Sequence, residues 1–233
     1  MTITAAQVMT LAGRNLGDED AVRWTLPEIA DWINEAVKAI LLAKPSANSV
    51  TDVVSLSAGT YQSIADGYLS LLRVVRNITT EGPPRVGGRI IRVTTRDALD
   101  AQAPYWHDPV QTPYKKEVRQ FVFDEESPRS FYVYPGNDGT GKVEAVMSKL
   151  PTVITANGSV DALASYDQDI GLQDIYLSPI LDYVLFRAMS KDDEAGNPAG
   201  SLAHYQAFAA AVGLKVKVEG ANSPNARPGV AGT

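Results

Sequence analysis

Apolar residues near the start of the chain recur at the three- and four-residue spacing of an amphipathic helix. One such stripe lies between Thr4, which is suited to cap a helix, and Gly17, which is suited to end one. A second stripe covers residues 26–44. It begins at the run Thr25-Leu26-Pro27-Glu28, a capping box in which the Thr25 hydroxyl accepts from the Glu28 amide while Glu28 reaches back. The pattern predicts two helices near the N-terminus.

The last third of the chain shows the same helical spacing. Residues 174–190 place a stripe of apolar side chains on one face. After a polar link at residues 191–196, Asn197-Pro198 offers a cap and a first-turn proline for another helix, which extends to Gly213 or somewhat past it. Two helices at each end of the chain favour one helical bundle that both ends close.

In the middle of the chain the periodicity changes from about 3.6 residues to about two, the spacing of strands. Turns rich in Pro and Gly separate the alternating runs, which favours antiparallel pairing. A short helix is predicted at residues 95–100, and an extended loop begins at Tyr105. The predicted strands cover residues 53–56, 69–78, 89–94, 117–123, 131–134 and 142–149.

These elements predict an α+β fold. Residues 1–50 and 170–219 form the helical bundle, and an antiparallel β module, a small sandwich or barrel-like sheet, is inserted at residues 51–169. Residues 220–233 are rich in Gly, Ala and Pro and cannot bury much apolar area, so we expect an extended C-terminal tail.

Composition narrows the possible functions. The chain has 233 residues, with 21 Lys and Arg, 27 Asp and Glu, and no cysteine. The absence of cysteine excludes disulfides and cysteine-based zinc sites, and the net charge of −6 argues against a general nucleic-acid binder. No apolar run approaches the roughly 20 residues of a membrane span, and the N-terminus lacks a signal-peptide pattern. We expect an acidic, soluble, intracellular protein that contacts no membrane.

The basic residues are unevenly distributed. Six arginines and a single acid, Glu81, occupy residues 71–96, a local charge of +5 that leaves −11 for the remainder. These arginines either pair with acidic turns, or form a patch that faces an acidic neighbouring subunit or DNA phosphates. The patch is assigned to Arg73, Arg76, Arg89 and Arg92.

Candidate catalytic chemistry is sparse. The chain has two histidines, and no nucleophile and base can be paired from their spacing. The acidic clusters lie at predicted turns and lack the spacing of a calcium loop. We therefore expect no catalytic site, no metal and no cofactor.

Residues 136–142 fit the phosphate-loop pattern GxxxxGK. Val143 occupies the position of the Ser or Thr that such a loop needs for magnesium, and the residues after Lys142 alternate like a strand. A hairpin loop explains the glycines better. A nucleotide-binding assembly factor that uses Gly136–Lys142 remains an alternative function.

A second alternative rests on aromatic residues of the extended loop. Tyr105, Trp106 and Tyr114 would form a stacking surface for sugar rings. The protein would then be a carbohydrate-binding module.

Six stretches of the chain together carry a resemblance to a known family: residues 24–34, 56–62, 72–77, 148–151, 182–192 and 203–208. They resemble the head-to-tail adaptor (connector) proteins of tailed bacteriophages. Their order along roughly residues 24–214, more than any single motif, carries the resemblance. The chain is also similar to the tail tubular A proteins of short-tailed phages, in which a helical bundle carries a β insertion.

The resemblance implies a structural virion protein. Such adaptors form a ring, usually dodecameric, between portal and tail, and line the channel through which DNA leaves. The implied partners are the phage portal protein, tail or nozzle proteins, further copies of the chain, and double-stranded DNA that passes without sequence-specific binding. The implied location is the neck of the virion, after assembly in the host cytoplasm.

Terminal segments of such adaptors commonly reach the portal. The resemblance therefore implies a partner contact near the C-terminus, where alternating residues suit a strand added to another protein's sheet edge. The assigned residues are Lys215, Val216, Lys217, Val218 and Arg227.

Overall fold

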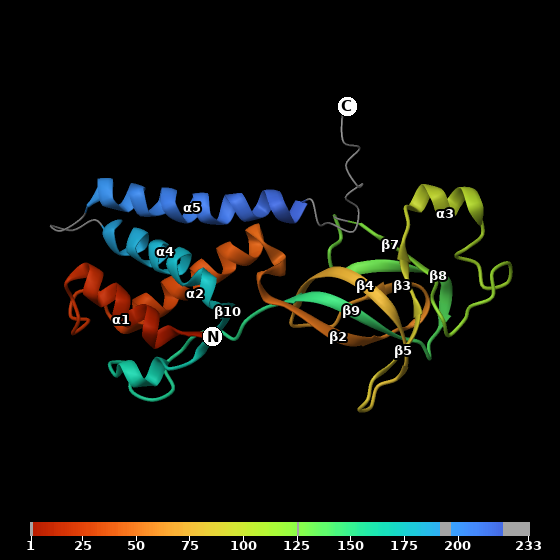
Figure 1. The fold of residues 1–233 in the computed structure, drawn as a ribbon, viewed down its shortest axis with the longest axis horizontal. Coiled ribbons are helices and arrows are strands. Elements are labelled where there is room, and N and C mark those ends of the chain that lie inside the picture. The colour runs from red at the N-terminus through yellow and green to blue at the C-terminus, as the bar shows by residue number, and fades with distance from the viewer. Residues whose placement is uncertain (1, 125, 192–196, 221–233) are drawn as a thin grey trace. The chain divides into compact units, whose positions relative to one another are not determined.

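A computed structural model describes residues 2–124, 126–191 and 197–220, with side chains described only up to residue 213 in the last range (Figure 1). The chain forms two compact units. We call them the helical unit, Met1–Asn48 with Pro151–Glu219, and the β unit, Ser49–Leu150. Helices together with mostly antiparallel strands confirm the predicted α+β class.

The helical unit takes its helices from both ends of the chain. Helices α1, α2 and α4 contact one another, and their buried faces are fully enclosed at Val8, Ile33 and Val184, among others. A short antiparallel pair, β1 with β10, joins the N-terminus to the segment before α4. The elements are β1 Thr2–Thr4, α1 Ala5–Leu16, α2 Leu26–Ala43, η1 Pro45–Asn48, η2 Leu163–Tyr166, β10 Asp169–Gln173, η3 Asp174–Tyr176, α4 Leu177–Met189 and α5 Pro198–Gly220.

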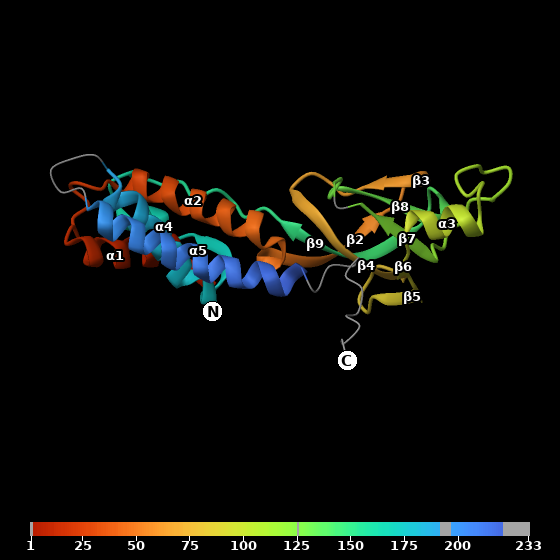
Figure 2. The same cartoon turned by 90° about the horizontal axis from the view of Figure 1, so that it is seen from above.

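Helix α5 lies alongside α4 (Figures 1 and 2). An aromatic contact joins the two helices, because the rings of Tyr183 and Phe208 lie 5.0 Å apart in an edge-to-face arrangement. His204 Nδ1 lies 2.9 Å from Asp182 Oδ1. Side-chain packing and a polar pair therefore both hold α5 on α4.

The helix termini follow the caps predicted from the sequence. Thr4 and Gln7 form a capping box at the start of α1, and Gly17 ends that helix with a φ of 67°. At the start of α2, the Glu28 carboxylate accepts from both the amide and the hydroxyl of Thr25, each at 3.3 Å. The predicted caps of both helices are confirmed.

The start of α2 is also tied to the end of α4. Lys191 Nζ lies 2.8 Å from Glu28 Oε1, and this contact is the largest cause of the lowered pKa of Glu28. The indole N–H of Trp24 donates to the carbonyl of Ala188 at 3.1 Å. These contacts explain how helices from opposite ends of the sequence are held together.

Residues 151–169 lie in the helical unit, although the sequence analysis assigns them to the β module. The Asn34 side chain of α2 makes two hydrogen bonds to the backbone of Ile154, at 2.8 and 2.9 Å. Tyr166 is 1% exposed in the same unit. The segment has no helical periodicity, and contacts such as those of Asn34 and Tyr166 leave no signal in the hydrophobic pattern.

Two four-stranded sheets form the β unit. Their orders are β2-β9-β4-β5 and β3-β8-β7-β6, and apolar side chains of both make up one buried cluster that includes Val74, Phe121, Phe131 and Val143. The sheets therefore pack face to face. The elements are β2 Ser49–Ser55, β3 Ala58–Ser63, β4 Tyr68–Thr80, β5 Val86–Ile90, β6 Arg92–Val93, α3 Arg96–Gln102, β7 Gln120–Phe123, β8 Ser130–Asp138 and β9 Lys142–Lys149.

The alternating run at residues 89–94 passes from one sheet to the other. Strand β5 ends at Ile90 in the first sheet, Ile91 is 7% exposed in the core, and β6 pairs with β7 in the second sheet. One predicted strand is therefore two, because alternation records which side chains are buried and not which sheet the backbone joins.

A buried amide links the first sheet to the segment that leads into β7. Asn77 on β4 is 4% exposed, and its Nδ2 donates to the carbonyls of Arg89 at 2.9 Å and Val118 at 2.7 Å. Its Oδ1 accepts from the Val118 amide at 2.9 Å. One side chain thereby satisfies three backbone groups beside the crossing between the sheets.

Replacing Asn77 by leucine is expected to destabilise the β unit. The buried carbonyls and amide would lose their partners, at a cost of about 3 kcal/mol in the free energy of unfolding. Urea unfolding followed by circular dichroism measures the change. Gln111→Leu, which alters an exposed amide of the same unit, is the matched control, and equal urea midpoints for the two variants would contradict the bridging role.

Candidate functional site

The arginines predicted as a surface patch do not share one face. Arg73 and Arg76 pair with Val146 and Glu144 of β9, which are two residues apart, so both arginines lie on the same face of the first sheet. Arg89 is adjacent to the residue that pairs with Arg76 and therefore points to the opposite face.

Arg76 is engaged within the β unit. Its Nε lies 2.7 Å from Glu144 Oε2, and Arg85 Nη1 lies 3.1 Å from Glu144 Oε1. The hydrogen bond from Arg76 is the largest cause of the lowered pKa of Glu144. A Cβ at Gly87 would lie 2.6 Å from Arg76 Nη1, so the glycine leaves room for this arginine. Arg76 therefore has an acidic partner, as one of the two readings of the sequence predicted. That partner lies on a strand and not in an acidic turn.

The other three arginines of the predicted patch are exposed. Within the described part of the chain, Arg73, Arg89 and Arg92 have no ion-pair partner. Arg92 lies in β6, at the edge of the second sheet. These three side chains are therefore available for contact with another molecule.

The GxxxxGK segment forms the β8–β9 hairpin, and a strand follows it where a phosphate loop needs a helix. A Cβ at Gly136 would lie 2.5 Å from the Tyr114 ring. Gly139 has a φ of 88°, and Lys142 Nζ pairs with Glu81 at 3.0 Å. The glycines therefore have packing and turn roles, and this geometry does not support the nucleotide-binding alternative.

Gly136→Ala is expected to destabilise the β unit by about 2 kcal/mol, because the added methyl group overlaps the ring of Tyr114. The same substitution in a Tyr114→Ala background should cost much less, since the obstructing ring is gone. Urea unfolding of the four proteins in this cycle gives the coupling energy. Strictly additive effects would contradict the packing role of Gly136.

The aromatic residues proposed as a sugar-stacking surface are not presented together. Trp106 is 0% exposed, and its indole N–H donates to Asp100 Oδ1 at 2.7 Å. Tyr105 is 66% exposed, and the half-buried Tyr114 donates its hydroxyl proton to the His107 carbonyl. The prediction that Trp106 is an exposed platform for sugar rings is wrong, because its ring is buried beneath the loop and not displayed on its surface.

His107 fixes this loop on the second sheet. Its ring lies 3.6 Å from that of Trp106, and its Nδ1 lies 2.7 Å from the hydroxyl of Thr60 on β3. Burial is the main cause of its lowered pKa, with a further lowering from Arg96 and an opposing effect from Asp100. The environment therefore favours the neutral imidazole.

Stability of the β unit should fall as the pH drops below about 6.5, the ordinary pKa of histidine. Below that value the unfolded chain takes up a proton that folded His107, with its lowered pKa, resists. Urea unfolding at pH 7.5 and pH 5.5 tests this. His107→Gln should flatten the dependence, whereas an equal slope in wild type and variant would contradict it.

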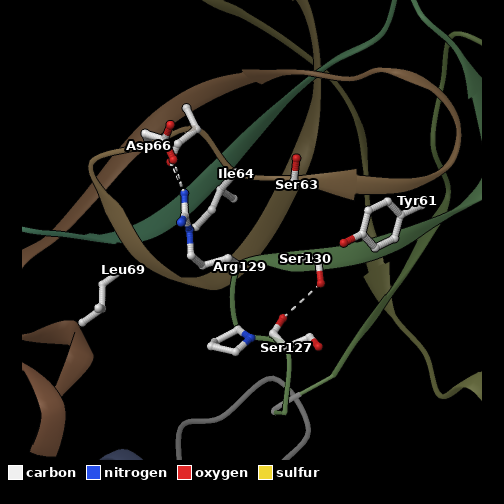
Figure 3. A pocket seen from close by; sticks show the side chains of 10 residues that line it. Tyr61, Ser63, Ile64, Asp66, Leu69, Ser127, Arg129 and Ser130 are labelled. Atoms are coloured by element: carbon white, nitrogen blue, oxygen red, sulfur yellow. Dashed lines mark hydrogen bonds and ion pairs between the residues drawn. The ribbon is translucent and has the colours of Figure 1, made fainter.

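An open hollow of about 660 Å³ lies beside the turn that follows β3 (Figure 3). Arg129 and Asp66 form an ion pair of 2.7 Å there, and both are exposed. The lining includes Ser63, Ser127 and Ser130 but no histidine, and its one carboxylate, Asp66, is the partner of Arg129.

In the ranges that the structure describes, no group of three or more His, Asp or Glu is placed to hold a metal. Within the same residues, every helix is too short or too polar to cross a membrane.

The C-terminal residues assigned to a partner contact lie at and beyond the end of the described part of the chain. Residues 215–218 lie within α5, so their backbone is helical and not extended as the alternation suggested. Arg227 and the tail from residue 221 lie outside the described residues.

Comparison with known proteins identifies the family. A search of curated proteins gave no match. The model of the SU10 adaptor protein family matches residues 3–228, which include both units. This match supports the resemblance to phage head-to-tail adaptors and does not extend to tail tubular protein A. The chain therefore belongs to the SU10 adaptor protein family.

Proposed function

We propose that this protein is a structural head-to-tail adaptor, located in the neck of a tailed phage particle. The family match over residues 3–228 carries the proposal. The match includes the helical unit and the inserted β unit, so it concerns the whole described architecture and not a shared fragment. The partners are the portal protein on one side and tail or nozzle proteins on the other.

We further propose that twelve copies of the chain form a ring, the usual number in such adaptors. A ring needs a heterologous contact, in which two different surfaces of each subunit meet and the rotation closes. A subunit with an acidic helical unit and a separate β unit has two chemically different surfaces for such a contact. The helices of the helical unit would form the bundle predicted from the sequence.

The charge distribution suits a channel for DNA. Residues 1–48 and 151–219 contain eight basic and fifteen acidic residues, a net charge of −7, whereas residues 49–150 contain twelve of each. An acidic wall offers few cations to phosphate, so double-stranded DNA would slide past without sequence-specific binding. We therefore assign the channel lining to the helical unit.

The proposed role requires no catalysis. Both histidines are engaged in contacts between elements, His107 with Thr60 and His204 with Asp182. The two hairpin glycines that suggested a phosphate loop have packing partners in Tyr114 and Asn137. The adaptor would assemble in the host cytoplasm and act through its binding surfaces, and the segment at residues 215–218 and Arg227 would reach the portal.

Electron microscopy of the full chain mixed with the portal protein from the same genome tests this function. We expect a ring stacked on one face of the portal. Images of either protein alone should lack this stacked ring. A chain ending at residue 214 should bind more weakly, because it lacks the proposed portal contact. Free portal rings beside unbound, correctly folded protein would contradict the adaptor role.

A further inference from the structure

We propose that the β2 edge of one copy pairs with the β5 edge of the adjacent copy, so that the first sheet continues from subunit to subunit. This inference rests on the proposed ring and names the two surfaces that meet in it. Both strands are edges of the same four-stranded sheet, whose order is β2-β9-β4-β5. A backbone ladder between these two different edges is a heterologous contact, as a ring requires.

Strand β2 has a long and regular edge. All seven of its residues pair with β9 in one unshifted register, and no other strand in the described part of the chain pairs with it. It contains none of the prolines, lysines or bulges with which proteins commonly protect an edge, and Ser49, Thr51, Asp52 and Ser55 are exposed. Such an edge is a template for a further strand.

Hydrogen bonds fix which backbone groups of β2 point away from the sheet. The Leu56 amide donates to the Gly141 carbonyl at 2.9 Å, so residues 56, 54, 52 and 50 face β9. The N–H and C=O groups of residues 49, 51, 53 and 55 therefore point outward. One of these groups, the Val53 amide, donates to Asp52 Oδ1 at 2.7 Å, as expected of an amide that no neighbouring strand uses.

The opposite edge of the first sheet exposes apolar side chains. Strand β5 and the short β6 that follows it are edge strands of the two sheets, and β5 lies on the other side of the β unit from β3 (Figure 2). Val86 is 46% exposed, Ile90 61% and Val93 42%. A neighbouring copy seated on this side would remove that apolar surface from water.

The backbone of Ile90 is available for a ladder. The Ile91 amide donates to the Val75 carbonyl at 3.1 Å. The next pair, Ile90 with Arg76, is therefore of the kind whose members exchange no hydrogen bonds, and the N–H and C=O of Ile90 point away from β4. The register of β5 on β4 shifts at two places, so the proposed ladder is anchored at Ile90.

Charge selects the register of the contact. Directions alternate through the first sheet, so β5 and the β2 of the next copy run antiparallel when the sheet continues. Pairing Ile90 with Thr51 of the next copy joins two outward-facing residues and sets Arg89 opposite Asp52. Both charged side chains are exposed, and Tyr68 holds the Asp52 carboxylate in place by donating to Oδ2 at 2.9 Å. Opposite charges across a ladder stabilise it.

Pairing of β2 with another β2 fits less well. Full antiparallel overlap would set Asp52 directly opposite its own counterpart, and like charges in that position destabilise a ladder. The contact would also be isologous, so it would close a dimer. Pairing β2 with β5 uses one edge of each copy and leaves the other edge for the next copy, so the contact can repeat around a ring.

Disulfide trapping tests the contact directly, because the chain has no cysteine of its own. The variant carries Thr51→Cys and Ile90→Cys. Residues that exchange both hydrogen bonds in an antiparallel ladder have Cα atoms about 5.5 Å apart, within reach of a disulfide. Mild oxidation of the variant assembled on portal rings should give a ladder of covalent oligomers on a non-reducing gel.

The matched control carries Ser55→Cys with Ile90→Cys. Ser55 is exposed and its backbone points outward like that of Thr51, but it lies about 13 Å further along the strand. In the proposed register this pair cannot close a disulfide, so the control should remain monomeric on the same gel.

Proline substitution tests the ladder without an engineered crosslink. Thr51→Pro removes an outward-facing N–H and leaves the bonds between β2 and β9 intact, a position at which edge strands tolerate proline. Circular dichroism should show a folded protein. Each junction loses a backbone hydrogen bond, so we expect assembly on portal rings, counted by mass photometry, to need at least about tenfold more protein than wild type. Thr51→Ala keeps the amide and should assemble as wild type does.

Other outcomes would overturn the inference. Normal assembly of Thr51→Pro shows that the ring does not use the β2 edge. Crosslinks through Ser55 but not through Thr51 contradict the register. If Thr51→Pro assembles poorly but the Thr51 and Ile90 cysteines form no crosslink, β2 pairs with a strand of another protein. Failure of the wild type to form a ring on the portal would contradict the proposed function itself, whichever edges are used.

Discussion

The antiparallel pairing of β2 with β9 is the interaction on which the topology of this chain depends. Its register runs without interruption from Ser49 opposite Ser148 to Ser55 opposite Lys142. Because the helical unit is built from both ends of the chain, the β unit has to begin and end side by side, and this strand pair provides that. An insertion closed in this way can have its own core without separating α2 from α4.

Local chemistry predicted the helices well and the tertiary contacts poorly. The capping boxes at Thr4 and Thr25 are short-range patterns, and the structure has both. Burial of Trp106 depends on a partner at Asp100 and on the sheet beneath the loop, so composition suggested an exposed aromatic where the structure has a core one. The segment at residues 151–169 shows the same limit. Asn34 binds it from a distant part of the sequence, and such a long-range contact leaves no periodic pattern.

The candidate surfaces show the same division. The cluster of arginines was visible in the sequence, but its division between the two faces of the first sheet depends on strand register. Glu144 on strand β9 forms ion pairs with both Arg76 and Arg85, and the alternating pattern of that strand gives no hint of them. Of the predicted patch, Arg73, Arg89 and Arg92 remain exposed without an ion-pair partner among the described residues.

The central claim is that the protein is a structural component of the phage neck, and cryo-electron microscopy of the neck in purified particles tests it most directly. The account predicts a ring between portal and tail into which the helical unit and the β unit each fit, with helical-unit density facing the DNA channel. A neck whose density is fully explained by other proteins, in particles that lack this chain by mass spectrometry, would contradict the claim.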